Sequence, residues 1–148
     1  MTESHPPASP ADHDVEFPTT PTGRLVWAWA PAGLMMVAIF AASSLANLTT
    51  LPGGMSDHLW HFLAYAVLGA LCVRGVALAR WQGVTLRSAV WAWCLAAAYG
   101  ATDEFHQAFV PGRTPAVDDW IADALGSGLA IVVVLLAALG RHVEDRKV

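Results

Sequence analysis

The chain has 148 residues, enough for one domain, and 55% of them are hydrophobic while only 14% are charged. Ordinary soluble domains carry about 25% charged residues, so this composition, with a mean hydropathy of +0.47, favours a membrane protein. The basic residues are few and scattered and the formal net charge is −4, which argues against a nucleic-acid-binding protein.

Residues 1–23 differ from the rest of the chain. They contain five prolines and four acidic residues but no lysine or arginine, and they hold few large apolar side chains. Such a segment cannot bury enough apolar surface to offset the entropy lost on folding, so we predict a disordered acidic tail. From Arg24 onward eight acidic residues balance eight basic ones, so the tail carries the whole net charge.

Four apolar runs follow the tail, over residues 25–43, 57–79, 88–110 and 117–139. Each is close to the length of about 20 residues that a helix needs to cross a bilayer, and none shows the strict alternation of a barrel strand. We therefore predict an all-α fold with four transmembrane helices in an up-down bundle. The first run is longer than the apolar core of a signal peptide, which has about 7–15 residues, and this favours a retained anchor.

Two cysteines, Cys72 and Cys94, lie inside these runs. Their spacing matches no metal-binding motif, and free cysteines are commonly buried as small apolar residues. We predict two buried thiols rather than a disulfide or a metal site.

Lysine and arginine residues predict the orientation, because connections rich in them remain in the cytoplasm. They precede the first run, separate the second from the third and follow the fourth: Arg24, Arg74, Arg80, Arg87, Arg141, Arg146 and Lys147. The two remaining connections contain only Arg113, so both termini are predicted in the cytoplasm. The predicted organisation is a cytoplasmic tail over residues 1–23, a membrane domain over residues 24–140 and a short charged cytoplasmic tail over residues 141–148.

The segment ATDEFHQAFVPGRTPAVDDWIAD, residues 101–123, interrupts the apolar pattern with titratable groups. These groups lie at the end of the third run and at the start of the fourth, and a further polar cluster opens the second run. In an up-down bundle all three places lie on the same side of the membrane, whichever way the chain is inserted. The distribution of arginine makes this the extracytoplasmic side.

Helical periodicity gathers the polar side chains on shared faces, because residues three or four apart are neighbours on a helix. The second run contributes Asp57, His61 and Tyr65, and the fourth contributes Asp119 and Asp123. The third run contributes a further set: Asp103, His106 and Gln107, with Glu104 at its edge. At about 1.5 Å per residue, the deeper side chains of all three runs reach a common level roughly 6–12 Å below the membrane surface. We predict that they line one recess.

Arg113 ends the turn Phe109-Val-Pro-Gly-Arg113, in which Pro111 and Gly112 stop the third helix. The turn holds Arg113 over the recess as its one fixed cation. Five carboxylates face it: Asp57, Asp103, Glu104, Asp119 and Asp123. In a low-dielectric site they cannot all remain ionised at low cost. Some are therefore protonated, paired with protonated histidine, bound to a cation or exposed to water.

Three motifs carry these residues: Asp57-x3-His61-x3-Tyr65, then D-E-x-H-Q-x-F-x-P-G-R over residues 103–113, then Asp119-x3-Asp123-x2-Gly126. With these motifs the chain resembles the VanZ-like family of bacterial integral membrane proteins, and the layout is similar over residues 25–140. The family often has lysine where this chain has His58, so a cation at that position depends on pH here.

The resemblance implies a four-helix membrane domain in the bacterial cytoplasmic (inner) membrane and a role at the cell envelope. The family takes its name from a glycopeptide-resistance cluster, whose founding member is linked to teicoplanin resistance. A glycopeptide-resistance-like role is therefore implied as well. No defined reaction comes with the resemblance.

Three interpretations of the recess remain open, and the first is ligand binding. The ligand would be a lipid-linked envelope precursor or a phosphate headgroup, since the guanidinium of Arg113 donates two hydrogen bonds at once. The carboxylates would hold an amine or sugar hydroxyls. The residues predicted to bind are Asp57, His61, Tyr65, Asp103, Glu104, His106, Gln107, Arg113, Asp119 and Asp123.

The second interpretation is a membrane-embedded hydrolase or transferase. Its catalytic candidates are His61 or Glu104 as general base, Arg113 as a stabiliser of phosphate charge, and Asp103. A divalent cation on Asp103, Glu104 and Asp123 would suit oxygen ligands, whereas the imidazoles of His61 or His106 would suit zinc.

The third interpretation is a network that locks the helices together without a ligand. The lipid bilayer is a partner in all three. A transporter is disfavoured, because the chain shows no internal repeat and its polar groups lie near one face only.

Overall fold

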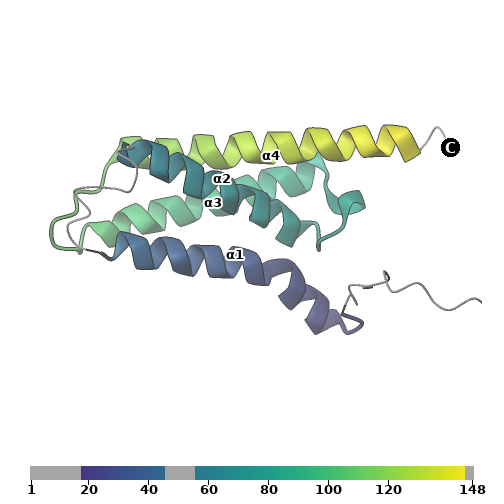
Figure 1. The fold of residues 1–148 in the computed structure, drawn as a ribbon, viewed down its shortest axis with the longest axis horizontal. Coiled ribbons are helices and arrows are strands. Elements are labelled where there is room, and N and C mark those ends of the chain that lie inside the picture. The colour runs from purple at the N-terminus through teal and green to yellow at the C-terminus, as the bar shows by residue number, and fades with distance from the viewer. Residues whose placement is uncertain (1–17, 46–55, 146–148) are drawn as a thin grey trace, which may run out of the picture.

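The computed structural model describes residues 18–45 and 56–145, and all regular structure in these residues is helical. The helices in chain order are α1 (Pro21–Ser43), α2 (Asp57–Val76), the short 3₁₀ helix η2 (Trp81–Gly83), α3 (Leu86–Gln107) and α4 (Val117–Asp145). Successive α-helices run in alternating directions (Figure 1). The predicted all-α fold is confirmed for the part of the chain that is described.

Three of the four α-helices are long and apolar enough to cross a membrane. They are α1, α2 and the part of α4 from Val117 to Val143. Helix α3 is not among them, because Arg87, Asp103 and Glu104 interrupt a helix that is otherwise rich in alanine and tryptophan. Large apolar side chains such as Leu34 cover the outer faces of the helices. Such surfaces are compatible with surrounding lipid.

Side-chain caps make two helices begin earlier than the apolar runs predict. The Thr20 hydroxyl accepts a hydrogen bond from the Gly23 backbone N–H at 3.1 Å, and Pro21 occupies the first turn of α1. Thr85 and Ser88 form a capping box that begins α3 at Leu86. The last three residues of the predicted acidic tail are therefore helical. The rest of that prediction falls mainly on residues 1–17, which lie outside the described residues.

The helix ends differ from the predicted ends for local reasons. Helix α2 stops three residues early, because Leu78 and Ala79 adopt left-handed backbone angles with φ of 52° and 57°. Helix α3 stops at Gln107, before the turn in which Gly112 has φ of 82°. Helix α4 continues beyond residue 139 to Asp145, and Arg141 in this extension lies over the ring of Trp81, 4.4 Å from its centroid. Part of the predicted tail over residues 141–148 is therefore helical.

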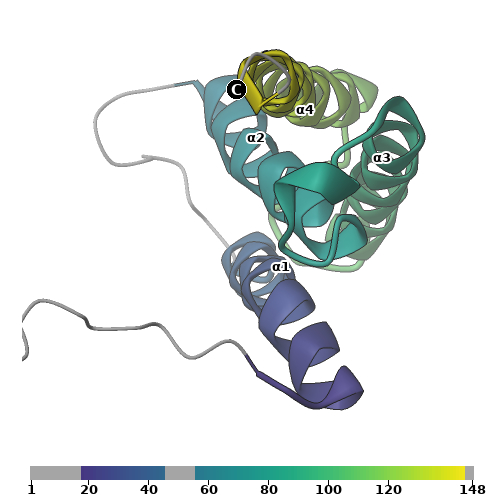
Figure 2. The same cartoon turned by 90° about the vertical axis from the view of Figure 1, so that its right-hand side faces the viewer.

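Glycine allows α2 and α4 to cross in close contact. A Cβ atom added at Gly69 would lie 2.7 Å from the backbone of Ser127, and one added at Gly126 would overlap the carbonyl oxygen of Phe62. Small residues commonly make such contacts between membrane helices. Helices α2, α3 and α4 surround one core, and α1 lies to one side against α2 and α3 (Figure 2).

Helix α1 is joined to α2 by a contact that the sequence did not predict. Pro31 lies inside α1 and cannot donate a hydrogen bond to the carbonyl of Trp27, four residues earlier. The Arg74 guanidinium donates to that carbonyl at 2.6 Å and to the carbonyl of Ala28 at 2.7 Å. Arg74 was predicted only as a charge that sets orientation, and it also supplies a donor where proline removed one. Helix α1 is bent along its length (Figure 1).

The two cysteines have different environments. Cys72 is buried in the core, as predicted, but Cys94 is exposed on the outer face of α3. The prediction was wrong for Cys94, because an apolar run does not reveal which of its faces packs against the bundle.

Candidate functional site

The polar ends of α2, α3 and α4 lie together at one end of the bundle, beside the end of α1 (Figure 1). Most of the polar side chains predicted to line a recess are buried there: Asp103, Glu104, Gln107, Asp119 and Asp123. Asp118, which precedes Asp119 in sequence, is exposed. Helical periodicity separates these two neighbours, as a turn of about 100° per residue requires.

Two histidine–aspartate pairs connect α2 to α4, one helical turn apart. His58 Nδ1 lies 2.5 Å from Asp119 Oδ1, and His61 Nδ1 lies 2.9 Å from Asp123 Oδ1. The His58 side chain is 59% exposed, whereas that of His61 is 10% exposed and that of Asp123 is fully buried. Only the inner pair is therefore shielded from water. The hydrogen bond between His61 Nδ1 and Asp123 fixes the orientation of the imidazole ring. The other ring nitrogen, Nε2, is not used in this bond.

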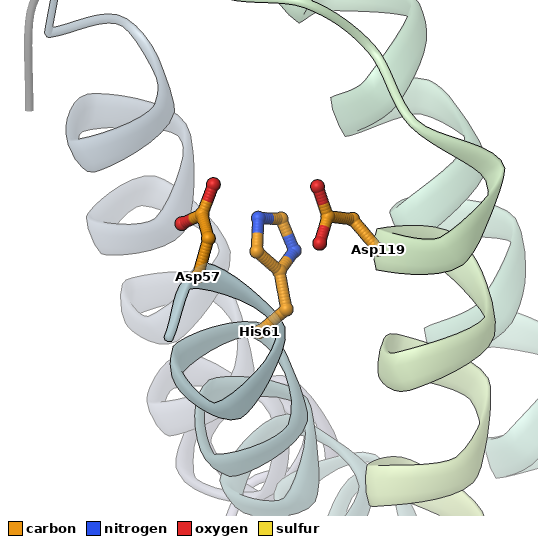
Figure 3. Close-up of side chains that lie close together, drawn as sticks. All are labelled: Asp57, His61 and Asp119. Atoms are coloured by element: carbon orange, nitrogen blue, oxygen red, sulfur yellow. The ribbon is translucent and has the colours of Figure 1, made fainter. Parts of the chain in front are cut away.

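Asp57 and Asp119 flank the ring of His61 (Figure 3). One ligand atom from each of these three residues lies within 4.8 Å of the others. The Asp57 side chain is exposed and lies 3.6 Å from the Arg113 guanidinium, measured from Oδ2 to a terminal nitrogen. This loose ion pair is at the mouth of the site, where water weakens it.

Helix α1 supplies two site residues that the sequence analysis missed. Ser43 donates a hydrogen bond from its hydroxyl to Asp103 Oδ1 at 2.6 Å, and the hydroxyl of Ser44 lies 2.9 Å from His106 Nε2. His106 also packs its ring against Phe40, with ring centroids 4.4 Å apart. His106 therefore faces α1 and does not line the cavity of the site. The sequence feature that could have predicted these contacts is the pair Ser43-Ser44. It ends the first apolar run on the side of the membrane where the polar residues are predicted.

Glu104 holds the connection between α3 and α4. Its Oε2 accepts a hydrogen bond from the backbone N–H of Ala116 at 2.8 Å. Gln107 donates to Asp103 Oδ2 at 3.3 Å and to Glu104 Oε1 at 3.5 Å. Glu104 was predicted at the edge of its helix face, and the connection that folds over it makes it buried.

A cavity of about 130 Å³ opens between α1, α2 and the end of α3. Its polar lining residues are Ser43, Asp57, Trp60, His61, Tyr65, Gln107 and Arg113. Within the part of the chain that the structure describes, three buried polar atoms of these residues have no hydrogen-bond partner: Trp60 Nε1, Tyr65 Oη and Arg113 Nε. Each is a hydrogen-bond donor, and burial without a partner costs about 1–3 kcal/mol. An acceptor-rich ligand in this cavity would satisfy them.

A second group of possible metal ligands lies deeper than the group around Asp57. His61, Glu104 and Asp123 come from three different helices, and one ligand atom from each lies within 4.8 Å of the others. Asp103, predicted from the sequence as a metal ligand with Glu104 and Asp123, belongs to neither group among the described residues. Its oxygens are bonded to Ser43 and Gln107.

The bundle matches a known family. A family model described as VanZ/LLP1 matches residues 24–138, which include every candidate site residue and most of all four α-helices. No curated protein and no solved structure matches the chain. Together with the three apolar helices, the match supports a helical membrane protein. The resemblance noted from the motifs is thus confirmed, and the chain belongs to the VanZ/LLP1 family.

Proposed function

We propose that this chain is a multi-pass protein of the bacterial cytoplasmic membrane in which all four α-helices cross the bilayer in up-down order. Helix α3 is the least apolar, but its acidic residues Asp103 and Glu104 are buried against neighbouring helices and do not face lipid. Intramembrane charges are tolerated in such positions. The distribution of arginine favours both termini, with residues 1–23 and 141–148, in the cytoplasm. The polar site then opens on the extracytoplasmic side.

At this site we assign the binding of an anionic headgroup, the phosphate of a lipid-linked envelope component. The observation that carries the assignment is a set of three buried donors around one cavity, on Trp60, Tyr65 and Arg113, for which the described residues supply no acceptor. Phosphate oxygens are strong acceptors, and arginine binds them with two parallel bonds. Pockets for drug-sized ligands have about 300–1,000 Å³. A cavity of about 130 Å³ suits a headgroup whose lipid chain stays in the bilayer.

A binding assay on purified protein tests this assignment. A polyprenyl phosphate is compared with the polyprenol of the same length, which lacks only the phosphate. We expect the phosphate form to bind at least about ten-fold more tightly, and we expect Arg113→Gln to remove this preference, since one good charged contact is equivalent to about 1.4 kcal/mol or more. The matched control is Arg87→Gln, because Arg87 is an exposed arginine at the opposite end of α3. Equal affinity of the wild-type protein for both lipids would contradict the assignment.

The same variant separates ligand binding from a network that only locks helices. Several polar groups are already paired within the protein, including Ser43 with Asp103 and Glu104 with Ala116. If the site serves packing alone, Arg113→Gln lowers the melting temperature and the wild-type protein does not distinguish the two lipids. If the site binds phosphate, the variant loses binding while the melting temperature changes little.

A second candidate function, hydrolysis or group transfer on the bound lipid, is favoured by the His61–Asp123 pair. A buried carboxylate that holds one nitrogen of an imidazole is a common way to orient a general base. His61 also lines the cavity, so it would act on a ligand bound beside Arg113. Incubation of the wild-type protein with a polyprenyl pyrophosphate, followed by analysis of the lipid, distinguishes the candidates: conversion supports an enzyme, and retention without conversion supports a binding role.

Membership of the family adds the proposal of a glycopeptide-resistance-like role at the cell envelope. Expression of the wild-type protein in a teicoplanin-sensitive bacterium is expected to raise the inhibitory concentration of teicoplanin. Expression of Arg113→Gln at the same level is expected to leave it unchanged. Equal resistance with both proteins would separate this role from the phosphate site.

A further inference from the structure

Four carboxylates are buried together at the polar end, and none of them is paired with a lysine or arginine of the described residues. Asp119, which is 6% exposed, is bonded to His58, and the other three lie deeper in the site. Asp103 is 3% exposed, Glu104 is 8% exposed and Asp123 is fully buried. The Arg113 side chain is directed to the exposed Asp57, at 3.6 Å. Buried carboxylates that remain charged need a cation nearby.

Two of these carboxylates, Glu104 and Asp123, are the least well satisfied by hydrogen bonds. Both oxygens of Asp103 accept hydrogen bonds, at 2.6 Å and 3.3 Å. Glu104 has one short bond, from the backbone of Ala116 at 2.8 Å, and one long contact from Gln107 at 3.5 Å. Asp123 has a bond on Oδ1 from His61, while Oδ2 has no hydrogen-bond partner among residues 18–45 and 56–145.

The unpartnered oxygen of Asp123 faces the helix that carries Glu104. A Cβ atom added at Gly100 would lie 2.9 Å from Asp123 Oδ2. Gly100 is four residues before Glu104, so the two lie on the same face of α3. Asp123 Oδ2, which is wholly buried, is therefore directed at the side of the site that holds Glu104. His61 lies beside both carboxylates.

We propose that His61, Glu104 and Asp123 bind a divalent transition-metal ion of the zinc type. An imidazole nitrogen together with carboxylate oxygens suits such ions, which take both kinds of ligand, whereas magnesium and calcium prefer oxygen alone. The three ligand atoms lie within 4.8 Å of one another. A tetrahedral zinc site with bonds of about 2.1 Å separates its ligands by about 3.4 Å, so small side-chain movements close the set around an ion. The fourth position is open to water or a ligand.

The ion connects α2, α3 and α4, and it lies one side chain away from the phosphate cavity, because His61 belongs to both. The outer group of Asp57, His61 and Asp119 is a weaker site. Its Asp57 is exposed, and Asp119 is already bonded to His58. Metal binding does not depend on phosphate binding in the cavity, so either proposal can fail alone.

Metal content and thermal stability of the purified full-length chain test the proposal. We expect wild-type protein, purified in detergent without chelators, to contain about one zinc-type ion per chain. Removal of the ion with a chelator is expected to lower the melting temperature by about 5 °C or more, and added zinc chloride is expected to restore it. Magnesium chloride should not restore it. This part of the experiment uses only wild-type protein, so its result does not depend on whether a variant folds.

Variants then assign the ligands. Glu104→Gln and Asp123→Asn are expected to lose the bound ion and the response to zinc, with folding checked by the elution profile of the protein in detergent. The matched control Asp118→Asn changes an exposed acid of the same helix, five residues before Asp123, and is expected to keep both. The proposal is overturned if wild-type protein neither contains nor responds to zinc. It is also overturned if magnesium acts equally well, or if Asp119→Asn loses the ion while Glu104→Gln retains it.

Discussion

Both ends of the bundle contain arginine side chains and a cavity, but among the described residues only the polar end has buried hydrogen-bond donors without a partner beside its cavity. At the end where α2 leads into α3, a cavity of about 280 Å³ is lined mainly by small apolar side chains together with Arg74 and Arg80. Arg74 is engaged by two backbone carbonyls of α1, and Arg141 lies over the ring of Trp81 at 4.4 Å. At the polar end the cavity is smaller, but three buried donors around it find no acceptor in residues 18–45 and 56–145.

This difference shows that unmet hydrogen-bonding capacity is a better indicator of function here than cavity size. Buried polar groups that serve only the packing of the fold normally have hydrogen-bond partners within the protein, because a buried group without a partner destabilises the folded state. Arg74 fits that description, whereas Arg113 has a loose contact to Asp57 and a buried Nε that no described residue accepts from. The comparison can be tested with matched substitutions at the two ends.

The largest expected effect distinguishes two glycines of α4. Gly126→Ala places a methyl group against the carbonyl oxygen of Phe62, so α2 and α4 must separate, and we expect a loss of about 3 kcal/mol in the free energy of unfolding. Gly140, toward the other end of α4, has open space around an added Cβ atom. Gly140→Ala is expected to be neutral or stabilising by up to about 1 kcal/mol. Thermal unfolding of both variants in detergent measures the difference, and equal destabilisation would contradict the close crossing at Gly126.

An intermediate effect is expected at Arg74. Arg74→Ala leaves the carbonyl of Trp27 without the donor that compensates for Pro31, and we expect a loss of about 2 kcal/mol in stability with affinity for polyprenyl phosphate unchanged. Arg80→Ala is the control, because Arg80 lies at the same end and is exposed. Arg113→Gln should show the opposite pattern, with binding lost and stability retained. Loss of lipid binding in Arg74→Ala would indicate a second ligand contact at the other end of the bundle. It would contradict the proposed difference between the two ends.

Much of the architecture follows from short-range patterns in the sequence. Apolar runs of helical length predict the four helices to within a few residues at most ends, and an up-down order brings the ends that carry His61, Glu104 and Asp123 to one place. Periods of three and four residues separate the buried Asp119 from the exposed Asp118. These features depend only on helix geometry and chain order, so no tertiary information is needed to predict them.

Other features depend on how the helices pack, and the sequence does not reveal them. Ser43 reaches Asp103 only because α1 lies against α3 at that level, and Arg74 meets Trp27 only because α1 packs against α2. Glu104 is buried by the connection that follows its own helix, and Cys94 is exposed because its face of α3 has no neighbour. Each outcome is set by contacts between residues far apart in the chain, for which amphipathic spacing carries no signal.

The smallest expected effect compares the neighbouring serines that end α1. Ser43 is buried and donates to Asp103 at 2.6 Å, so Ser43→Ala leaves a buried carboxylate oxygen without its donor. We expect this change to lower stability by about 1–2 kcal/mol. Ser44 is exposed, and its contact with His106 competes with water, so Ser44→Ala should change stability by less than about 0.5 kcal/mol. Melting temperatures of the two variants, measured side by side, decide whether α1 belongs to the polar site. If both serines can be replaced without effect, the network ends at Asp103, and the site consists of α2, α3 and α4 alone.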